Sequence, residues 1–246
     1  MSIIVLGACL VLINYRNAVL RDYVLVLRNP FSSALTVAST LSAIYLAIAS
    51  CAAMTREKEE GTLYVLFTGP VNAVSFVLGS FVAQILTNVL MLAVLGTSFW
   101  LISLMTGFLL PPGIIASMAY VLIATSGMIA LGVLVAAAVG KTRAAILVLL
   151  LFVFAVLILQ GGDSLLYRPS FQGTDSQLLV VGRTFHTLNS ITKWVSPFSY
   201  LVNGLDAIFI RRGMDVALNL VSSILFSTVS LVLAVRTLAA KGVLPS

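Results

Sequence analysis

Residues 71–106 read VNAVSFVLGSFVAQILTNVLMLAVLGTSFWLISLMT, a stretch of 36 residues without a single Asp, Glu, Lys or Arg. At about 1.5 Å per helical residue, a helix of this length exceeds the roughly 30 Å hydrocarbon core of a bilayer. The uncharged run extends in both directions, from Gly61 to Gly140, a total of 80 residues. Within it, Pro111-Pro112-Gly113 predicts a tight turn, so this region is expected to form two membrane-spanning helices.

The whole chain has the composition of an integral membrane protein. Of its 246 residues, 60% are hydrophobic and 9% are charged, and the mean hydropathy is +1.13. A soluble domain carries about a quarter charged residues, because a surface that faces water needs polar cover. The composition therefore excludes soluble, disordered, collagen-like and disulfide-scaffold classes. We expect an all-α fold, a polytopic helical membrane protein with one transmembrane domain over residues 1–246.

The charge-free runs predict six transmembrane helices. The first is the shortest, because Ser2 to Asn14 must continue to Leu20 to cross, with the Arg16 side chain reaching back to the interface. The expected spans cover approximately residues 2–20, 31–54, 71–106, 114–139, 144–160 and 214–235. An even number of spans places both termini on the same side of the membrane.

A long connector, residues 161–213, precedes the last span. Apolar residues recur at three- and four-residue spacing from Leu178 to Val195, which predicts an amphipathic helix lying at the membrane surface. Ser196-Pro197 ends this pattern, and residues 199–210 predict a second short helix. The distribution of basic residues among the loops does not decide on which side of the membrane these helices lie.

The densest charge cluster joins the second and third spans and reads TREKEEGTLYVLFTGPV over residues 55–71. Its charged half can dock in a groove of a soluble partner, and its apolar half can pack against the bundle. Gly61 can relieve helical geometry between the two halves. The alternative is an ordinary solvated loop, charged because it faces water.

The cluster resembles the signature of ABC-2 type transporter permeases, R-E-[RK]-E-x-G-T-L-E-x-L-L followed by a proline that opens the next span. Tyr64 stands where that pattern usually has an acidic residue, and Phe67 replaces its last leucine. The segment WVSPFSY, residues 194–200, is similar to the short proline-aromatic segment before the last span of these permeases. The matching positions are Arg56, Glu57, Lys58, Glu59, Gly61, Thr62, Leu63, Leu66 and Pro70.

The resemblance implies a permease subunit of an ABC transporter that works by alternating access, most simply as an exporter. Residues 55–69 would form a cytoplasmic coupling helix whose Glu57, Glu59 and Glu60 face a separate ABC ATPase subunit. ATP and Mg²⁺ would bind that partner, so this chain would hold no cofactor and would not itself be an enzyme. A second permease subunit, identical or related, would complete a dimer in a bacterial-type inner membrane, among membrane lipid. Both termini would be cytoplasmic, and the two helices of the 161–213 connector would be extracytoplasmic.

A second hypothesis is a permease-like scaffold or accessory subunit of a larger membrane complex that no longer transports. A membrane-embedded enzyme is a third, disfavoured because the spans carry no paired carboxylates or histidines. The basic residues are scattered rather than clustered, so the net charge of +6 does not predict a nucleic-acid partner. The GKT sequence at residues 140–142 does not predict a phosphate loop, because Val135 occupies the position of the first glycine.

Three polar residues share one face of the third span, at intervals of four. Ser80, Gln84 and Asn88 are candidates either for a substrate path or for hydrogen bonds between helices. His186 is the only histidine, and no Cys, Asp or Glu accompanies it at ligand spacing, so no metal site is expected. Cys9 and Cys51 both lie in apolar stretches and are expected to be small packing residues.

Overall fold

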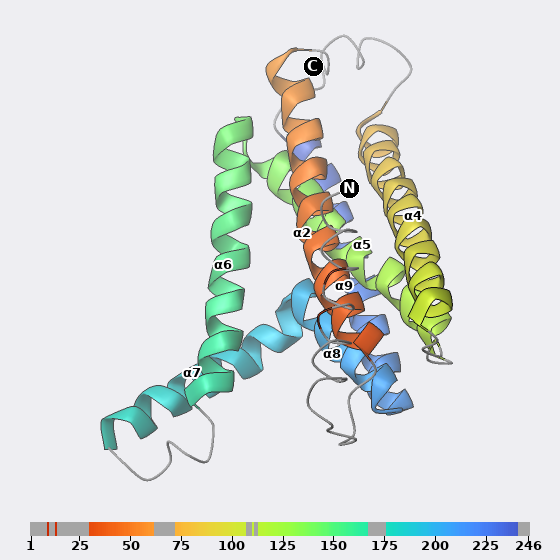
Figure 1. Ribbon diagram of the computed structural model, residues 1–246. Coiled ribbons are helices and arrows are strands. Elements are labelled where there is room, and N and C mark those ends of the chain that lie inside the picture. Colours follow the sequence, from red (N-terminus) through yellow and green to blue (C-terminus); the bar gives the residue numbers. More distant parts are fainter. Residues whose placement is uncertain are drawn as a thin grey trace.

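The computed structural model describes residues 30–61, 72–106, 110, 113–166 and 176–240, together with positions 9 and 13. Over these ranges the ordered elements are all helices, and no strand occurs among them. The helices, labelled in Figure 1, are α2 (Pro30–Glu59), α4 (Ala73–Thr106), α5 (Ile114–Ala138), α6 (Thr142–Leu166), α7 (Ser176–Val195), α8 (Pro197–Phe209) and α9 (Gly213–Ala240).

Five of these helices, α2, α4, α5, α6 and α9, are long and apolar enough to cross a membrane. The expected helical multi-pass membrane fold is confirmed at this level. The first of the six expected spans, residues 2–20, falls outside the described ranges, so the sixth crossing stays a prediction.

Several helices extend beyond the expected spans. The second expected span ends at residue 54, whereas α2 continues through the charged residues to Glu59. Likewise α6 runs to Leu166, six residues beyond its expected end, and α9 runs to Ala240. The charged residues that extend α2 are Arg, Glu and Lys, which are good helix formers, so this helix does not end where its apolar run ends. The expected 161–213 connector therefore contains the end of α6 as well as α7 and α8.

The five long helices alternate in direction along the bundle (Figure 1). We call the end that carries Glu59, Ala138 and Ala240 the upper end, as it is drawn in Figure 1, and the opposite end the lower end. The end of α2, the start of α4, the connection from α5 to α6 and the end of α9 all lie at the upper end. The helices α7 and α8 lie at the lower end.

Helix α5 is the centre of the bundle. It packs most extensively against α9 and α2, and also contacts α8, α4 and α6. Every residue from Gly127 to Val133 is buried, so this part of the helix is covered on all sides. A helix that is apolar all round fits such a position, because no face of it needs to be polar.

Small residues allow the helices around α5 to approach closely. A Cβ atom added at Gly132 would lie 2.3 Å from the backbone oxygen of Ala47 in α2, so only glycine fits at this crossing. The Ser50 hydroxyl beside it donates to the backbone oxygen of Ile129, at 3.3 Å. On the α9 side, the hydroxyls of Ser126 and Ser227 are 3.0 Å apart. Small residues and hydroxyl hydrogen bonds are typical of interfaces between membrane helices. Burial of apolar surface does not drive helices together there, because the surrounding lipid is equally apolar.

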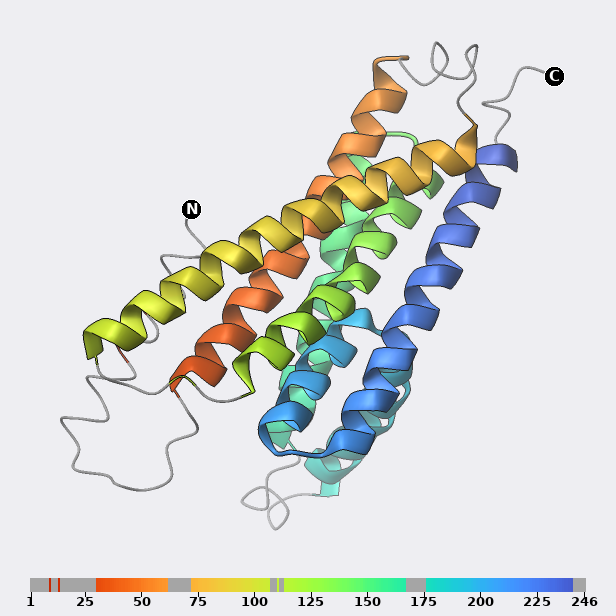
Figure 2. The same cartoon turned by 90° about the vertical axis from the view of Figure 1, so that its right-hand side faces the viewer.

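The outer helices present apolar faces to their surroundings. In Figure 2, α4 runs obliquely across α2 and α5 and packs along one stripe only. Leu86, Leu90 and Leu104 on α4 are at least 60% exposed, and exposed leucines and valines also cover the outer faces of α6 and α9. In a bilayer these faces meet lipid or another subunit, because the hydrocarbon core accepts apolar side chains at no cost.

The short helix α8 anchors the lower end of the bundle. The hydroxyl of Tyr120 in α5 donates to the backbone oxygen of Tyr200, at 2.6 Å, and its ring fills the space beside Gly204. The side-chain amide of Gln160 in α6 donates to the hydroxyl of Ser199, at 2.8 Å. Helix α7 runs outward beneath α6 (Figure 1). Its described side chains include the exposed Leu188, Ile191, Trp194 and Val195.

Candidate functional site

The charged residues of the sequence motif lie at the upper end of the bundle. Residues 55–59 form the last turns of α2 and therefore continue the second span rather than start a new helix. Gly61 ends this helix in the left-handed region, with φ of 71°, and its amide donates to the backbone oxygen of Lys58 at 3.3 Å. A left-handed glycine just past the last turn is a common helix stop, because glycine has no Cβ to clash there. The expected coupling helix covers residues 55–69, and its part from residue 62 onward lies outside the described residues. The remaining motif positions, which are Thr62, Leu63, Leu66 and Pro70, lie there too.

Lys58 ties the end of α2 to the end of α5. Its ammonium group donates to the backbone oxygens of Ala136 at 2.6 Å and of Ala137 at 3.0 Å. These oxygens belong to the last turn of α5, which lacks further helical amides to satisfy them. A cation at a helix carboxyl end also interacts favourably with the helix dipole.

Glu59 ties the end of α2 to the start of α6. One of its carboxylate oxygens accepts the backbone amide of Thr142 at 2.8 Å, and the other accepts the Thr142 hydroxyl at 2.9 Å. Thr142 is the first residue of α6, so Glu59 satisfies a free amide at a helix amino end, where negative charge is favoured. Two neighbouring residues of α2 therefore form hydrogen bonds on both sides of the loop between α5 and α6.

A groove of about 590 Å³ opens beside these contacts. Its charged walls come from two segments, the end of α2 and the start of α6. Arg56 pairs with Glu60 one turn further along, at 2.6 Å, and both side chains are largely exposed, at 76% and 52%. Glu57 lies nearby and is partly buried. The lining residues are Ala52, Ala53, Arg56, Glu59, Glu60, Lys141, Thr142 and Arg143.

The sequence located the charged segment but not its partners. Thr142 follows Glu59 by 83 positions, and the oxygens that Lys58 binds belong to alanines. Backbone groups carry no signal in a sequence, so only the basic GKTR loop itself could have pointed to this region. We expected Glu57, Glu59 and Glu60 to face a partner subunit. Of these, Glu59 binds Thr142 within the chain and Glu60 pairs with Arg56.

The three polar residues of the third span lie on the inner stripe of α4. Asn88 is fully buried and its amide nitrogen donates to the Thr125 hydroxyl of α5. Its amide oxygen has no hydrogen-bond partner. Ser80 and Gln84 are half-buried on the same stripe, closer to the upper end. The structure thus brings Asn88 into a contact between helices.

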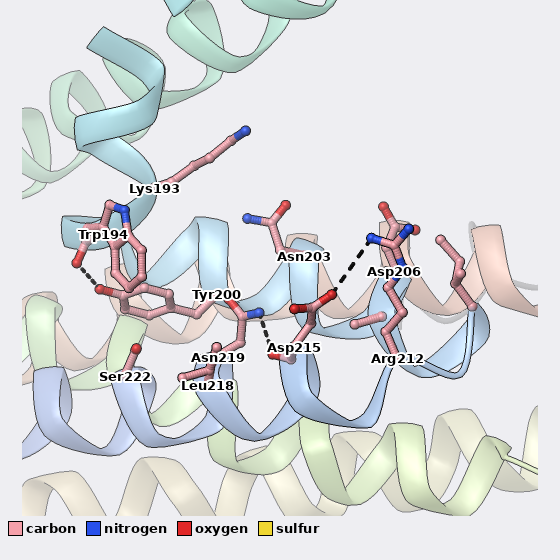
Figure 3. Close-up of a pocket in the computed structure, with 12 residues that line it drawn as sticks. Lys193, Trp194, Tyr200, Asn203, Asp206, Arg212, Asp215, Leu218, Asn219 and Ser222 are labelled. Carbon is pink, nitrogen blue, oxygen red and sulfur yellow. Dashed lines mark hydrogen bonds and ion pairs between the residues drawn. The ribbon is translucent and has the colours of Figure 1, made fainter. Parts of the chain in front are cut away.

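A second polar site, which the sequence reasoning did not single out, lies at the lower end. It is a pocket between the end of α7, α8 and the start of α9, drawn in Figure 3. The residues around it include two aspartates and two cationic side chains, Lys193 and Arg212. Among the described residues, no three His, Cys, Asp or Glu side chains gather closely enough to hold a metal ion.

No protein-family model matches this chain, and no curated protein is significantly similar to it.

Proposed function

We propose that this chain is the membrane-spanning permease subunit of an ABC transporter of the ABC-2 type, exporting its substrate by alternating access. Separate ATPase subunits would dock at the upper end, bind ATP and Mg²⁺, and supply the energy. The proposal rests on the motif at residues 55–70 and on one observation. Lys58 and Glu59 join the end of α2 to the last turn of α5 and the first turn of α6.

This junction suits the transmission of force. A partner that displaces the end of α2 also displaces α5 and α6, since both are hydrogen-bonded to it. Helix α2 is unbroken over 30 residues, which at about 1.5 Å per residue is roughly 45 Å. A push at Glu59 therefore reaches the lower end of the bundle through a single rigid element.

The exposed charges beside the junction fit a protein partner. Arg56 and Glu60 line the groove at the end of α2, Glu57 follows Arg56 on the same helix, and Lys141 and Arg143 line the groove from the α6 side. Both signs of charge are present, which favours one docking orientation over others. On this proposal the upper end is cytoplasmic, both termini lie there, and α7 and α8 cover the extracytoplasmic exit.

The same proposal explains what covers the outer apolar faces of the helices. A second copy of the chain, or a related permease, would cover part of the exposed surface of the bundle, and bilayer lipid would cover the rest. The six-span layout and the bacterial-type inner membrane belong to this proposal.

Purification of the whole chain from its native membrane in mild detergent tests the proposal. We expect a soluble subunit with intact nucleotide-binding motifs to co-purify. Glu57→Lys should weaken this association, because it reverses a charge beside the groove and leaves the contacts of Lys58 and Glu59 in place. The matched control is Arg211→Glu, a charge reversal on an exposed residue at the lower end, which should leave the association intact.

A second variant separates docking from force transmission. Glu59→Gln keeps the size of the side chain but removes its negative charge at the start of α6. The ATPase should still bind, while substrate transport per ATP hydrolysed should fall. Co-purification with integral membrane proteins alone would contradict the transporter proposal and favour the scaffold hypothesis.

A further inference from the structure

The pocket at the lower end has the size and walls of a small-molecule site. Its volume is about 400 Å³, within the roughly 300–1,000 Å³ of typical ligand pockets. Figure 3 shows side chains from α7, α8 and α9 surrounding one space. The lining residues are Lys193, Trp194, Tyr200, Asn203, Asp206, Ala207, Ile210, Arg212, Asp215, Leu218, Asn219 and Ser222.

Hydrogen bonds hold the walls in place. The Tyr200 hydroxyl donates to the backbone oxygen of Trp194, which fixes the end of α7 against α8. Burial raises the pKa of the Tyr200 phenol, so it stays protonated and keeps this bond. The Tyr200 ring also packs edge to face against Phe226 of α9, with centroids 6.5 Å apart. Across the pocket, the Asn219 amide donates to the backbone oxygen of Asp215 at 2.7 Å.

The pocket carries two charges of each sign. Lys193 and Arg212 are cationic, and Asp206 and Asp215 are anionic. Arg212 and Asp215 approach only to 3.8 Å and are 70% and 49% exposed, so their ion pair is loose and can open for a ligand. A ligand with a single negative charge would meet two carboxylates, and one with a single positive charge would meet two cations. A zwitterion satisfies both sets of charges.

One wall of the pocket continues into an apolar surface along the membrane span. Leu218 lines the pocket, and Val221 and Leu225 follow it at helical spacing on α9, with exposures of 51%, 61% and 64%. Trp194, also in the wall, is 70% exposed. Tryptophan side chains are enriched at headgroup depth in a bilayer, and Trp194 closes the amphipathic helix α7 beside the start of α9. A ligand whose polar part fills the pocket can therefore lay an apolar tail along α9.

We propose that this pocket binds the headgroup of a zwitterionic amphiphile that carries a phosphate ester and a primary ammonium group. Lys193 and Arg212 bind the phosphate, and Asp206 and Asp215 accept the ammonium protons. Phosphatidylethanolamine of the surrounding bilayer is the source that fits, because its acyl chains match the apolar face of α9. This site is independent of the proposed transport function, since it requires neither an ATPase nor a second permease.

Native mass spectrometry of the whole chain, released from vesicles of defined composition, tests the site. The vesicles contain equal amounts of phosphatidylethanolamine, phosphatidylcholine and phosphatidylglycerol. We expect preferential retention of phosphatidylethanolamine. Phosphatidylcholine should follow, because its quaternary ammonium cannot donate hydrogen bonds to Asp206 and Asp215. Phosphatidylglycerol should be retained least, because it has no cation for them.

Variants that remove one charge each locate the binding to the pocket. Lys193→Gln and Asp215→Asn should each lower phosphatidylethanolamine retention about threefold, and the double variant about tenfold, as expected for partly exposed charge contacts. The matched controls at the opposite end are Arg236→Gln and Glu60→Gln, which should retain lipid as the unaltered chain does. Asp206→Asn provides a second carboxylate variant with the same expected result.

The same headgroup chemistry occurs in a membrane lipid and in a soluble compound, and competition with soluble phosphoethanolamine distinguishes these two sources. The soluble compound should displace the lipid only in large excess, because it has no chains to contact α9. Displacement at an equimolar ratio would overturn the membrane lipid as the ligand. Retention of phosphatidylglycerol equal to that of phosphatidylethanolamine, or unchanged retention in the pocket variants, would overturn the zwitterion site.

Discussion

At the upper end of the bundle, charged side chains bind backbone groups of neighbouring helices, whereas at the lower end they surround an open pocket. Lys58 and Glu59 bind the backbone ends of α5 and α6, so those two charges lock three helices together. Lys193, Arg212, Asp206 and Asp215 instead line a cavity. Both ends therefore have a charged cavity, but only at the upper end do two charged side chains join three helices through hydrogen bonds.

A helix at each end is followed by a residue with left-handed backbone, but the type of that residue differs. Both α2 and α8 end in a residue with left-handed backbone, at φ of 71° for Gly61 and 60° for Arg211. After α8, the Arg212 amide donates to Ala207 and the Arg211 amide to Ile208, the pattern of a helix stop that usually has glycine. Glycine adopts this backbone conformation without strain, so Gly61 is relaxed. Arg211, next to the pocket residue Arg212, carries backbone strain because it has a Cβ atom.

The largest expected effect is at the crossing of α2 and α5, which supports the upper end. Gly132→Ala places a Cβ atom 2.3 Å from both the Ala47 backbone oxygen and the Ser50 hydroxyl. The helices must separate, at a cost of about 2–3 kcal/mol of folding free energy. Thermal unfolding in detergent, followed by size-exclusion chromatography, measures the loss.

Gly79→Ala is the matched control for this substitution, since nothing lies within 4 Å of its added Cβ. It should be neutral or slightly stabilising, because alanine favours a helix interior. Equal stability of the two variants would show that α2 and α5 do not cross so closely in the membrane. In that case we would no longer expect the upper end to move as one body.

An intermediate effect is expected from Lys58→Met. This variant keeps an unbranched apolar stem but leaves the oxygens of Ala136 and Ala137 without the ammonium donor. We expect a loss of about 1–2 kcal/mol, from two charge-assisted hydrogen bonds at a helix end. Hydrogen exchange of the last turn of α5 should accelerate together with the fall in melting temperature.

Lys141→Met serves as its control, because Lys141 is exposed in the adjacent loop. Its stability should stay close to that of the unaltered chain. If both lysine variants melt alike, the bond from α2 to α5 contributes nothing and the two ends of the bundle differ less than the geometry indicates.

The smallest effects are expected from exchanging the two helix stops. Gly61→Ala puts a Cβ on a left-handed residue in open space, so the cost is backbone strain alone, about 1 kcal/mol. Arg211→Gly relieves the corresponding strain, but glycine gains freedom in the unfolded chain, so the net gain should stay below about 1 kcal/mol. Paired melting curves measure both, and a stabilising Gly61→Ala would contradict the left-handed stop.

The spans could be predicted from the sequence because exclusion of charge from a bilayer is a strong and local signal. The residue at which a helix ends could not, since at the end of α2, for example, residues 56–59 are both charged and good helix formers. The helices of the long connector were expected at residues 178–195 and 199–210, close to α7 and α8, because their apolar spacing and Ser196-Pro197 are visible in the sequence.

The contacts of the candidate site were less accessible to sequence reasoning. Gly61 was expected to relieve helical geometry, and it does so as a left-handed residue. The partners of Lys58 and Glu59 are mostly backbone atoms nearly 80 or more positions away, which no residue pattern encodes. The pocket escaped notice because Lys193 is 13 or more positions from the other three charges, Asp206, Arg212 and Asp215, and only the packing of α7 against α8 and α9 brings it to them.

The central position of α5 has a consequence for how the protein is assembled during synthesis. Its most extensive contact is with α9, which is the last of the described helices to be translated. Until α9 arrives, the Ser126 hydroxyl lacks its partner Ser227, and Gly127 has only Pro197 of α8 as a native neighbour on this face. The nascent chain therefore holds an apolar but incompletely packed α5 in the bilayer, and the native bundle closes only after residue 240 has been made.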